Sequence, residues 1–349
     1  MMTATIAGMG WVTPLGRDLE SVWRAVCRSE PADVSQLENP ISKRSTPVLR
    51  VPEDIVRDAA TLPRLRRSSL ISHFAVAAAS DAALSAGMTT EKLSRTALIF
   101  AASDGGVIYT RRFYADVVER GEGAGSPLLF PETVYNAPAS HIAARLGLQG
   151  EALTLVGDAA TGVTAVRTGC ELIATGEADY CLVTAAQEID WITCEAYSRW
   201  GLIRDDSGQS SVFSEGAAAI VLAREPGDCR VSATHPGFSC PTEKDTEERL
   251  DAVLAEILPG SQVILSVACA SGTRLDIAER NCLERRLPAA RVLAPKAILG
   301  ESLACSTVQQ VIVGVLALRE AGGGDALVTT IGYNRQVAGL ILTQDSRQG

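Results

Sequence analysis

The sequence has no excess of positive charge and no long apolar run. Lysine and arginine number 32 against 41 aspartates and glutamates, for a formal net charge of −9. Such a chain has no basic stripe to neutralise a phosphate backbone or an anionic bilayer, so neither nucleic acid nor a membrane is an expected partner. No run approaches the roughly 20 apolar residues that span a bilayer, and the opening MMTATIAGMGWVTPLG lacks a charged segment before an apolar core. We therefore expect a cytoplasmic protein.

Clusters of cysteine and histidine are also missing. The nine cysteines are an odd number, they form no Cys-x-x-Cys pair, and only three histidines occur in 349 residues. Disulfide frameworks and structural zinc sites both need such clusters. We expect reduced thiols that are mostly buried, no metal and no other cofactor.

The chain does contain enough apolar material for a large core. Hydrophobic residues make up 46% of the sequence and charged residues 21%, which suits one large domain or two fused halves. The run TALIFAAS predicts a buried strand, and residues 69–88 have helical periodicity that ends at Gly87, a typical helix stop. VIYTRRFYADVVERG and ASHIAARLGL predict further helices. Together these runs predict an α/β fold.

One pattern occurs twice along the chain. Residues 153–186 have the order strand, small-residue turn, long helix, glycine, strand, and residues 291–332 repeat that order. The pair Gly157-Asp158 of the first copy corresponds to Gly300-Glu301 of the second. We interpret this as a duplicated architecture whose strands are buried by helices.

The duplication predicts two halves that together form one unit. We place the first half at residues 1–228 and the second at 229–349. The polar stretch 225–248, which contains prolines and several acids, is the expected linker between them.

The order of these segments resembles the β-ketoacyl synthase branch of the thiolase-like superfamily. IAGMGWVTPLGRDLESVW resembles the family's opening strand and helix, SDGGVIYTRRFY its glycine turn and next helix, and FPETVYNAPASHIAARLGLQG its segment beside the dimer axis. SEGAAAIVLARE resembles the strand pair that closes the first half, and PKAILGESLACSTVQQVIVGVLALREAG belongs to the second. The resemblance covers nearly the whole chain. It implies a thiolase-like fold, in which two βαβαβαββ halves form a layered αβαβα sandwich.

Ketosynthases of this family use one cysteine and two histidines, and all three positions differ here. Ala159 takes the place of the nucleophilic cysteine at the turn before the long helix. The run CASGT at residues 269–273 matches the loop of the first histidine, so Cys269 stands at a histidine position. Near the second histidine position Lys296 is kept, but Glu301 replaces the histidine. The resemblance therefore implies a degenerate triad, and we expect no condensing activity from this chain by itself.

The chain offers no histidines that could replace the missing pair. His73 lies in a helical run, His141 at a helix start and His235 in the expected linker.

The family's second glycine-rich turn, whose backbone N–H helps to build an oxyanion hole, corresponds to residues 330–336. Gly332 and Tyr333 match its start, but Asn334 and Arg335 replace glycines. The resemblance implies that this oxyanion loop is degraded as well.

A ketosynthase-like chain without the triad resembles the chain length factors of bacterial type II polyketide systems. That resemblance implies a heterodimer with an active ketosynthase paralogue, and an acyl carrier protein that carries the growing polyketide chain. The role of the inactive subunit would be to line the tunnel for that chain, whose length is then limited by steric volume.

Candidate tunnel residues follow the glycine turn. Val107, Thr110 and Tyr114 are spaced i, i+3 and i+7 and so share one helix face. Spacing alone favours an ordinary core stripe, whereas the resemblance makes this face a tunnel wall. Trp191 and Thr193 are further candidates, although Trp191 also suits a core. The expected dimer interface contains Phe130, Pro131, Tyr135, Asn136, Pro138, Leu153 and Leu155.

Two other functions stay open. Cys269 and Glu301 would share one pocket in the family geometry and could act in acyl transfer or hydrolysis. Lys296 is the one visible cation that could then lower the pKa of the thiol. The other function is a stand-alone homodimer that binds an acyl chain or an acyl carrier protein.

Overall fold

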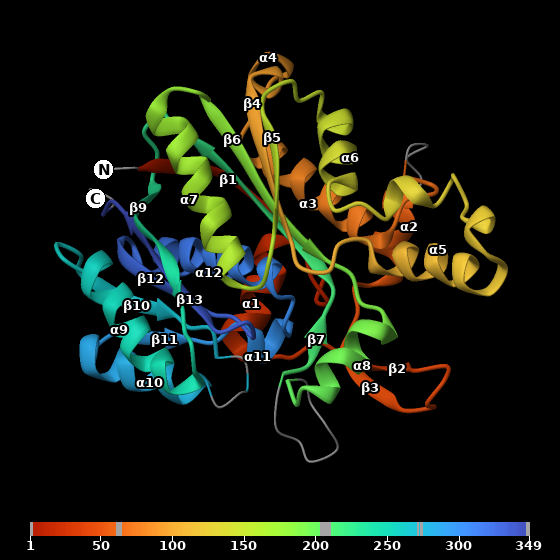
Figure 1. The fold of residues 1–349 in the computed structure, drawn as a ribbon. Coiled ribbons are helices and arrows are strands. Elements are labelled where there is room, and N and C mark those ends of the chain that lie inside the picture. Colours follow the sequence, from red (N-terminus) through yellow and green to blue (C-terminus); the bar gives the residue numbers. More distant parts are fainter. Residues whose placement is uncertain (1–2, 61–64, 203–210, 271, 273–274, 347–349) are drawn as a thin grey trace.

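A single large sheet runs through the molecule. The computed structural model describes residues 3–60, 65–202, 211–270, 272 and 275–346, and in that part of the chain ten strands pair in the order β11-β10-β12-β13-β9-β1-β8-β6-β4-β5 (Figure 1). The strands are β1 (Ala4–Val12), β4 (Thr96–Ala102), β5 (Ala152–Val156), β6 (Tyr180–Gln187), β8 (Gly216–Ala223), β9 (Cys229–Ser239), β10 (Val263–Val267), β11 (Arg291–Leu293), β12 (Gly324–Ile331) and β13 (Gln336–Gln344).

The strand order repeats within the sheet. Strands β5-β4-β6-β8-β1 and strands β11-β10-β12-β13-β9 follow the same order when each set is renumbered from its first strand. In both sets the first three strands are parallel to one another, and each of the last two is antiparallel to the strand before it in this order. The helices that connect them are α3 (Leu70–Ser85), α6 (Ala137–Leu146), α7 (Ala160–Thr175), α9 (Thr246–Ile257), α10 (Leu275–Arg286) and α12 (Ala304–Ala321). Each set is therefore a βαβαβαββ unit, and the thiolase-like α/β fold is confirmed.

Helices α7 and α12 form the central layer of the sandwich. They contact each other, and each contacts strands of both sets, whereas α3 and α6 cover one outer face and α9 and α10 the other (Figure 1). Residues 304–318 of α12 are all buried, as expected of a helix enclosed on every side. Gly162 lets the two central helices approach closely, since a Cβ there would lie 2.5 Å from Cβ of Thr307.

The remaining elements are mostly insertions in the first half. They are α1 (Leu19–Arg28), β2 (Val34–Glu38), β3 (Ser45–Leu49), α2 (Glu53–Ala60), α4 (Thr90–Ser94), α5 (Val107–Arg120), α8 (Trp191–Arg199) and β7 (Phe213–Ser214), with α11 (Lys296–Leu299) in the second half. Strands β2, β3 and β7 form a separate small sheet. Short 3-10 helices cover Glu122–Ala124, Phe130–Glu132 and Glu243–Asp245.

The expectation that residues 225–248 form a linker is wrong. Strand β9 occupies Cys229–Ser239 and pairs with both β1 and β13, so this stretch joins the two sets of strands. The prediction failed because only Cys229, Val231 and His235 are fully buried in this strand, so no apolar run marks it in the sequence. His235 therefore lies buried in a strand. The division of the chain at residue 228 stays a prediction.

The cysteines are as the sequence predicts. Eight of the nine are buried and all nine are free thiols, Cys27 being the exposed one. In the described part of the chain, no helix is both long and apolar enough to cross a bilayer.

Candidate functional site

The turn between β5 and α7 carries a methyl group where the resemblance places a nucleophile. Ala159 is 1% exposed, so its side chain faces the protein interior. Thr307 of α12 donates a hydrogen bond from its hydroxyl to the carbonyl oxygen of Ala159, at 2.8 Å. The turn is thus held against the central helix of the second half, and a buried methyl group at its tip cannot form a thioester.

Three side chains that the sequence places at or beside the two histidine positions form one buried cluster. Nζ of Lys296, at the start of α11, lies 2.6 Å from Oε2 of Glu301 and 3.0 Å from Sγ of Cys269, which follows β10. Both charged side chains are 3% exposed and Cys269 is 1% exposed. The structure therefore brings Cys269, Lys296 and Glu301 together as expected. Ser271 and Thr273 of the same run lie outside the described residues.

The charges of this cluster favour an ion pair beside a neutral thiol. Burial raises the pKa of Cys269 to about 12, although Lys296 acts to lower it. The thiol donates to the carbonyl oxygen of Ile331 at 3.3 Å, as a protonated sulfur would. Burial also acts to lower the pKa of Lys296, but Cys269 and Glu301 raise it well above its usual value. At neutral pH the cluster thus contains neither a thiolate nor a free amine, and acyl transfer from Cys269 is disfavoured.

We expect Cys269 to resist alkylation in the folded chain. With iodoacetamide at about pH 8, where a thiol of ordinary pKa reacts readily, peptide mass spectrometry should find Cys27 modified and Cys269 unmodified, because Cys27 is exposed and Cys269 is buried as a neutral thiol. The Cys269→Ala variant identifies the peptide, and denatured protein shows that the thiol can react. Rapid labelling of Cys269 in the folded chain would instead favour relocated acyl chemistry.

Glu279 fixes the loop that carries Cys269, and the sequence reasoning missed it. The carboxylate of this buried α10 residue accepts hydrogen bonds from the backbone N–H groups of Cys269 and Ala270, at 2.7 and 3.0 Å, and from the hydroxyl of Thr329 at 2.6 Å. Its only sequence signal is an acid inside the helical run that follows the loop. Glu279 acts through Cys269 and Ala270, as a positioning residue.

The turn between β12 and β13 keeps a glycine-like backbone at Arg335, although Asn334 and Arg335 stand where the resemblance places glycines. Arg335 has a φ of 62°, the left-handed conformation that glycine adopts most easily. Its side chain is exposed and donates to the carbonyl oxygen of Pro241, so it points away from the site. The backbone N–H of Asn334 donates to Oδ2 of Asp158 at 2.9 Å. Asp158 is thus a second site residue whose role the sequence did not predict.

Acidic and aromatic side chains lie in and around the turn that carries Ala159. Burial raises the pKa of Asp104 to about 6 and also raises that of Asp158. The ring of Tyr333 packs edge-on against that of Tyr197, with centroids 5.7 Å apart. Burial raises the pKa of Tyr197, and the charges of Asp104, Asp158 and Glu301 add to this effect.

The histidines bond to residues outside the cluster. Nε2 of His73 lies 2.8 Å from the carbonyl oxygen of Leu65, and Nε2 of His141 lies 2.7 Å from Oε1 of Glu132. His235 accepts a hydrogen bond from the N–H of Gly237 and pairs with Glu256.

Tyr114 does not belong to a core stripe. It is 58% exposed, while Val107 and Thr110 on the same face of α5 are half-buried. The start of α5 is held by Glu188, a buried residue beyond β6, whose carboxylate accepts from the N–H groups of Ile108 and Ile71 at 2.8 and 2.9 Å. The helix is therefore fixed at its N-terminus while its side chains stay open to a partner.

The second group of tunnel candidates lies at the start of α8. Trp191 is half-buried beside the guanidinium of Arg111, which lies 5.8 Å from the ring centroid. Arg111 also donates to both carboxylate oxygens of Asp190 at 2.9 Å, and this links α5 to α8. Thr193 is buried.

The expected interface residues differ in exposure. Phe130 and Tyr135 are 55% and 45% exposed. Pro131 and Asn136 are also exposed, whereas Pro138 is buried within this chain in the first turn of α6. Leu153 and Leu155 are half-buried on β5, which ends the strand order and pairs only with β4 in the described sheet.

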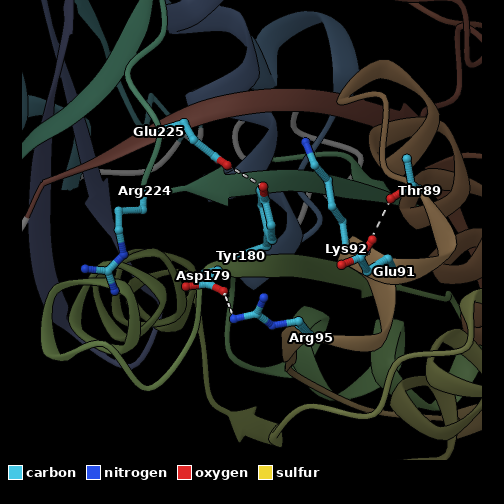
Figure 2. Close-up of a pocket in the computed structure, with 8 residues that line it drawn as sticks. All are labelled: Thr89, Glu91, Lys92, Arg95, Asp179, Tyr180, Arg224 and Glu225. Atoms are coloured by element: carbon cyan, nitrogen blue, oxygen red, sulfur yellow. Dashed lines mark hydrogen bonds and ion pairs between the residues drawn. The ribbon is translucent and has the colours of Figure 1, made fainter.

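A separate polar pocket of about 560 Å³ lies at the other end of the first-half strands, where β4 and β6 begin (Figure 2). Figure 2 shows two of its polar contacts: Arg95 forms an ion pair with Asp179, and the hydroxyl of Tyr180 donates to Glu225 at 2.5 Å. The pocket is therefore distinct from the turn at Ala159.

Comparison with known proteins identifies the family. The family model "Beta-ketoacyl synthase, N-terminal domain" matches residues 3–226. The chain belongs to the β-ketoacyl synthase family. Among curated relatives, this ketosynthase-family chain is 23% identical over 186 residues to 3-oxoacyl-[acyl-carrier-protein] synthase 2 of Vibrio harveyi, an alignment that spans 52% of this chain and 45% of that enzyme. The synthase of the same name from Mycobacterium tuberculosis is 22% identical over 356 residues, 90% of this chain and 84% of that enzyme.

Solved structures share the fold over the full length of this family member. The ishigamide ketosynthase/chain length factor superposes with a TM-score of 0.85 at 19% identity, and covers 98% of this chain and 99% of that one. A complex of a type II polyketide synthase acyl carrier protein with its ketosynthase bound to the hexaketide gives 0.81 at 15% identity, with coverages of 98% and 99%. A β-ketoacyl synthase from Burkholderia phymatum gives 0.77 at 17% identity, with coverages of 99% and 100%.

Proposed function

We propose that this chain is a non-catalytic subunit of the chain length factor type. It pairs with an active ketosynthase paralogue and lines part of the tunnel for a growing polyketide chain. The proposal rests on the residues that fill the interior of the site. A buried Ala159 occupies the nucleophile position, and the Lys296–Glu301 ion pair fills the pocket that the resemblance assigns to histidine. A well-packed site without a thiolate or a free amine suits a structural role.

The segment from α5 to β5 exposes many apolar side chains that a stable partner would cover. Of the fifteen large apolar side chains that are exposed in the described residues, seven lie between residues 114 and 156: Tyr114, Val118, Leu128, Phe130, Val134, Tyr135 and Val156. Such a concentration is typical of an interaction surface. Within the described residues, strand β5 also has no neighbour along its outer edge, so a partner strand can add to the backbone groups there.

The choice of partner rests on what this chain lacks. A second copy of the chain would supply no cysteine at position 159, whereas a paralogue with an intact triad would supply the chemistry. One structural neighbour is described as a ketosynthase/chain length factor and another contains an acyl carrier protein, so both kinds of partner occur with this fold. We propose the same two partners here.

Coexpression tests this proposal. The tagged chain is produced with a ketosynthase paralogue from the same genome, and we expect an equimolar complex on size-exclusion chromatography. Phe130→Asp should weaken the complex by at least about tenfold, because it places a charge in a desolvated apolar interface. Ile41→Asp is the matched control, since Ile41 is 79% exposed in the turn between β2 and β3 and is not among the expected interface residues.

Other results would contradict the proposal. A homodimer that ignores the paralogue would favour the stand-alone binding protein. An acyl adduct on this chain after incubation with acylated carrier protein would favour an enzyme that uses Cys269.

A further inference from the structure

Asp158 holds two backbone N–H groups that come from opposite halves of the chain. Its Oδ1 accepts from the N–H of Ala159 at 2.7 Å, and its Oδ2 accepts from the N–H of Asn334 at 2.9 Å. Asp158 is 8% exposed, so this carboxylate is nearly withdrawn from water. Both donors therefore point at a single internal anion.

Helix capping does not explain this arrangement. A capping aspartate accepts from the N–H two or three residues further on. Here the N–H of Thr161 is bonded to the backbone oxygen of Asp158, at 2.8 Å, and the carboxylate reaches Asn334 instead, 176 residues away. The side chain thus bridges two loops rather than ending a helix.

The two donors come from the two places that supply an oxyanion hole, and they bond to the two oxygens of one carboxylate, Oδ1 and Oδ2. Acyl-transfer sites place the backbone N–H of the nucleophile residue and one from a nearby loop around the oxygen that becomes negative. Ala159 stands at the nucleophile position, and Asn334 lies in the loop that corresponds to the family's oxyanion turn. We propose that the Asp158 carboxylate occupies this oxyanion hole from within. The site is then closed to a thioester carbonyl independently of the missing nucleophile.

The neighbouring residues are shaped around the carboxylate. A Cβ added to Gly332 would lie 2.9 Å from Oδ2 of Asp158, so glycine at this position makes room for the anion. Thr307 holds the carbonyl of Ala159 from the other side. The turn that carries Asp158 is therefore fixed by its surroundings.

The reaction that would be blocked is acyl transfer to a thiol at position 159. There the thiolate attacks the thioester carbonyl carbon and the π electron pair moves to the oxygen. That oxyanion then collapses and expels the donor thiolate, which takes up the proton lost by the attacking thiol. An oxyanion beside the Asp158 carboxylate would be repelled, and its two donors would be occupied. Removal of one such donor costs about 10²–10³ in rate in known enzymes.

Three variants of the full chain test the proposal: Ala159→Cys, Ala159→Cys with Asp158→Ala, and Ala159→Cys with Asp104→Asn. Each is treated with octanoyl-N-acetylcysteamine, and acylation at position 159 is followed by mass spectrometry. Rates are normalised to iodoacetamide alkylation of the same thiol, which needs no oxyanion hole. The Asp104→Asn variant is the matched control, because it removes a nearby half-buried acid that accepts from Gln187 and from neither donor.

We expect acylation to be at least about 100-fold faster with Asp158→Ala than in either other variant, at similar alkylation rates. Equal acylation in all three variants would overturn the proposal, as would no acylation with Asp158→Ala despite normal alkylation. A thiol that iodoacetamide cannot reach in any variant would also count against it, since burial alone would then close the site.

This inference rests on the proposed loss of catalysis, but the two can fail separately. Assembly with a ketosynthase does not depend on Asp158, so a heterodimer with an open oxyanion hole would overturn only the inference. A chain that ignores the paralogue, yet shows the Asp158 effect, would overturn only the subunit role.

Discussion

Replacing Lys296 with methionine is expected to lower the free energy of unfolding by about 3–5 kcal/mol near neutral pH, because the buried Glu301 then loses its counter-charge. Methionine has a similar length and fills the same space, so a cavity contributes little. Oε2 of Glu301 would then have neither the ammonium group of Lys296 nor water as a hydrogen-bond donor. Oε1 would still accept from the N–H of Leu303 at 2.8 Å. Urea denaturation of the Lys296→Met variant beside the parent measures the loss.

The matched control for this prediction neutralises both partners. In Lys296→Met with Glu301→Gln, the amide oxygen still accepts from Leu303 and no charge is buried, so most of the lost stability should return. A single variant as stable as the parent would show that the ion pair does not hold this site together.

The pH dependence of the parent follows from the direction of the Lys296 shift. Its pKa in the folded chain lies above the ordinary 10.5. The contribution of Lys296 is therefore fully present below about pH 10.5 and is lost as pH rises through the folded value. Between pH 6 and 9 this contribution should be constant, which makes neutral urea curves a fair comparison.

The sequence predicted the architecture where patterns were long or repeated. Residues 153–186 and 291–332 contain α7 and α12, the two equivalent central helices, and both copies carry the predicted strand, turn and helix. Strand β9 was missed because it contains a proline and few apolar residues, and because the residues on both sides of it include further prolines and several acids, which resembled a linker. Its position became visible only from its pairing with β1 and β13.

The sequence predicted a site residue only where that residue belongs to a motif whose place in the order of segments matches the family. The positions of Ala159, Cys269 and Glu301 followed from segment order, and the structure brings Cys269 and Glu301 to the same lysine. Asp158 and Glu279 carry no spacing signal, because their partners are set by how distant loops meet. Helical spacing could place Tyr114 on the face of Val107 and Thr110, but it could not decide whether that face is core or surface.

The exposure of Tyr114 leads to the second large expected effect. In the complex reconstituted with the ketosynthase, Tyr114→Ala should shift the product to at least one further extension, and Tyr114→Trp should shift it to at least one fewer. The reason is steric. Tyr114 projects from a helix whose start is fixed by Glu188, so in the proposed tunnel its size sets the space left for the polyketide chain. Packed protein interiors do not expand readily to accept a larger side chain. Liquid chromatography with mass spectrometry of the released products measures the shift.

Tyr109→Ala provides the matched control on the same helix. Position 109 is five residues earlier, about 140° around the helix from position 114, and the ring of Tyr109 packs against the guanidinium of Arg112, 5.3 Å from its centroid. Loss of that ring should leave product length unchanged. Unchanged products in both Tyr114 variants would remove Tyr114 as a length determinant, and an equal shift with Tyr109→Ala would point to a general loosening of α5. Opposite shifts for Ala and Trp at position 114, with none at 109, can come only from the volume at that one position, because loosening would act in the same direction in both variants.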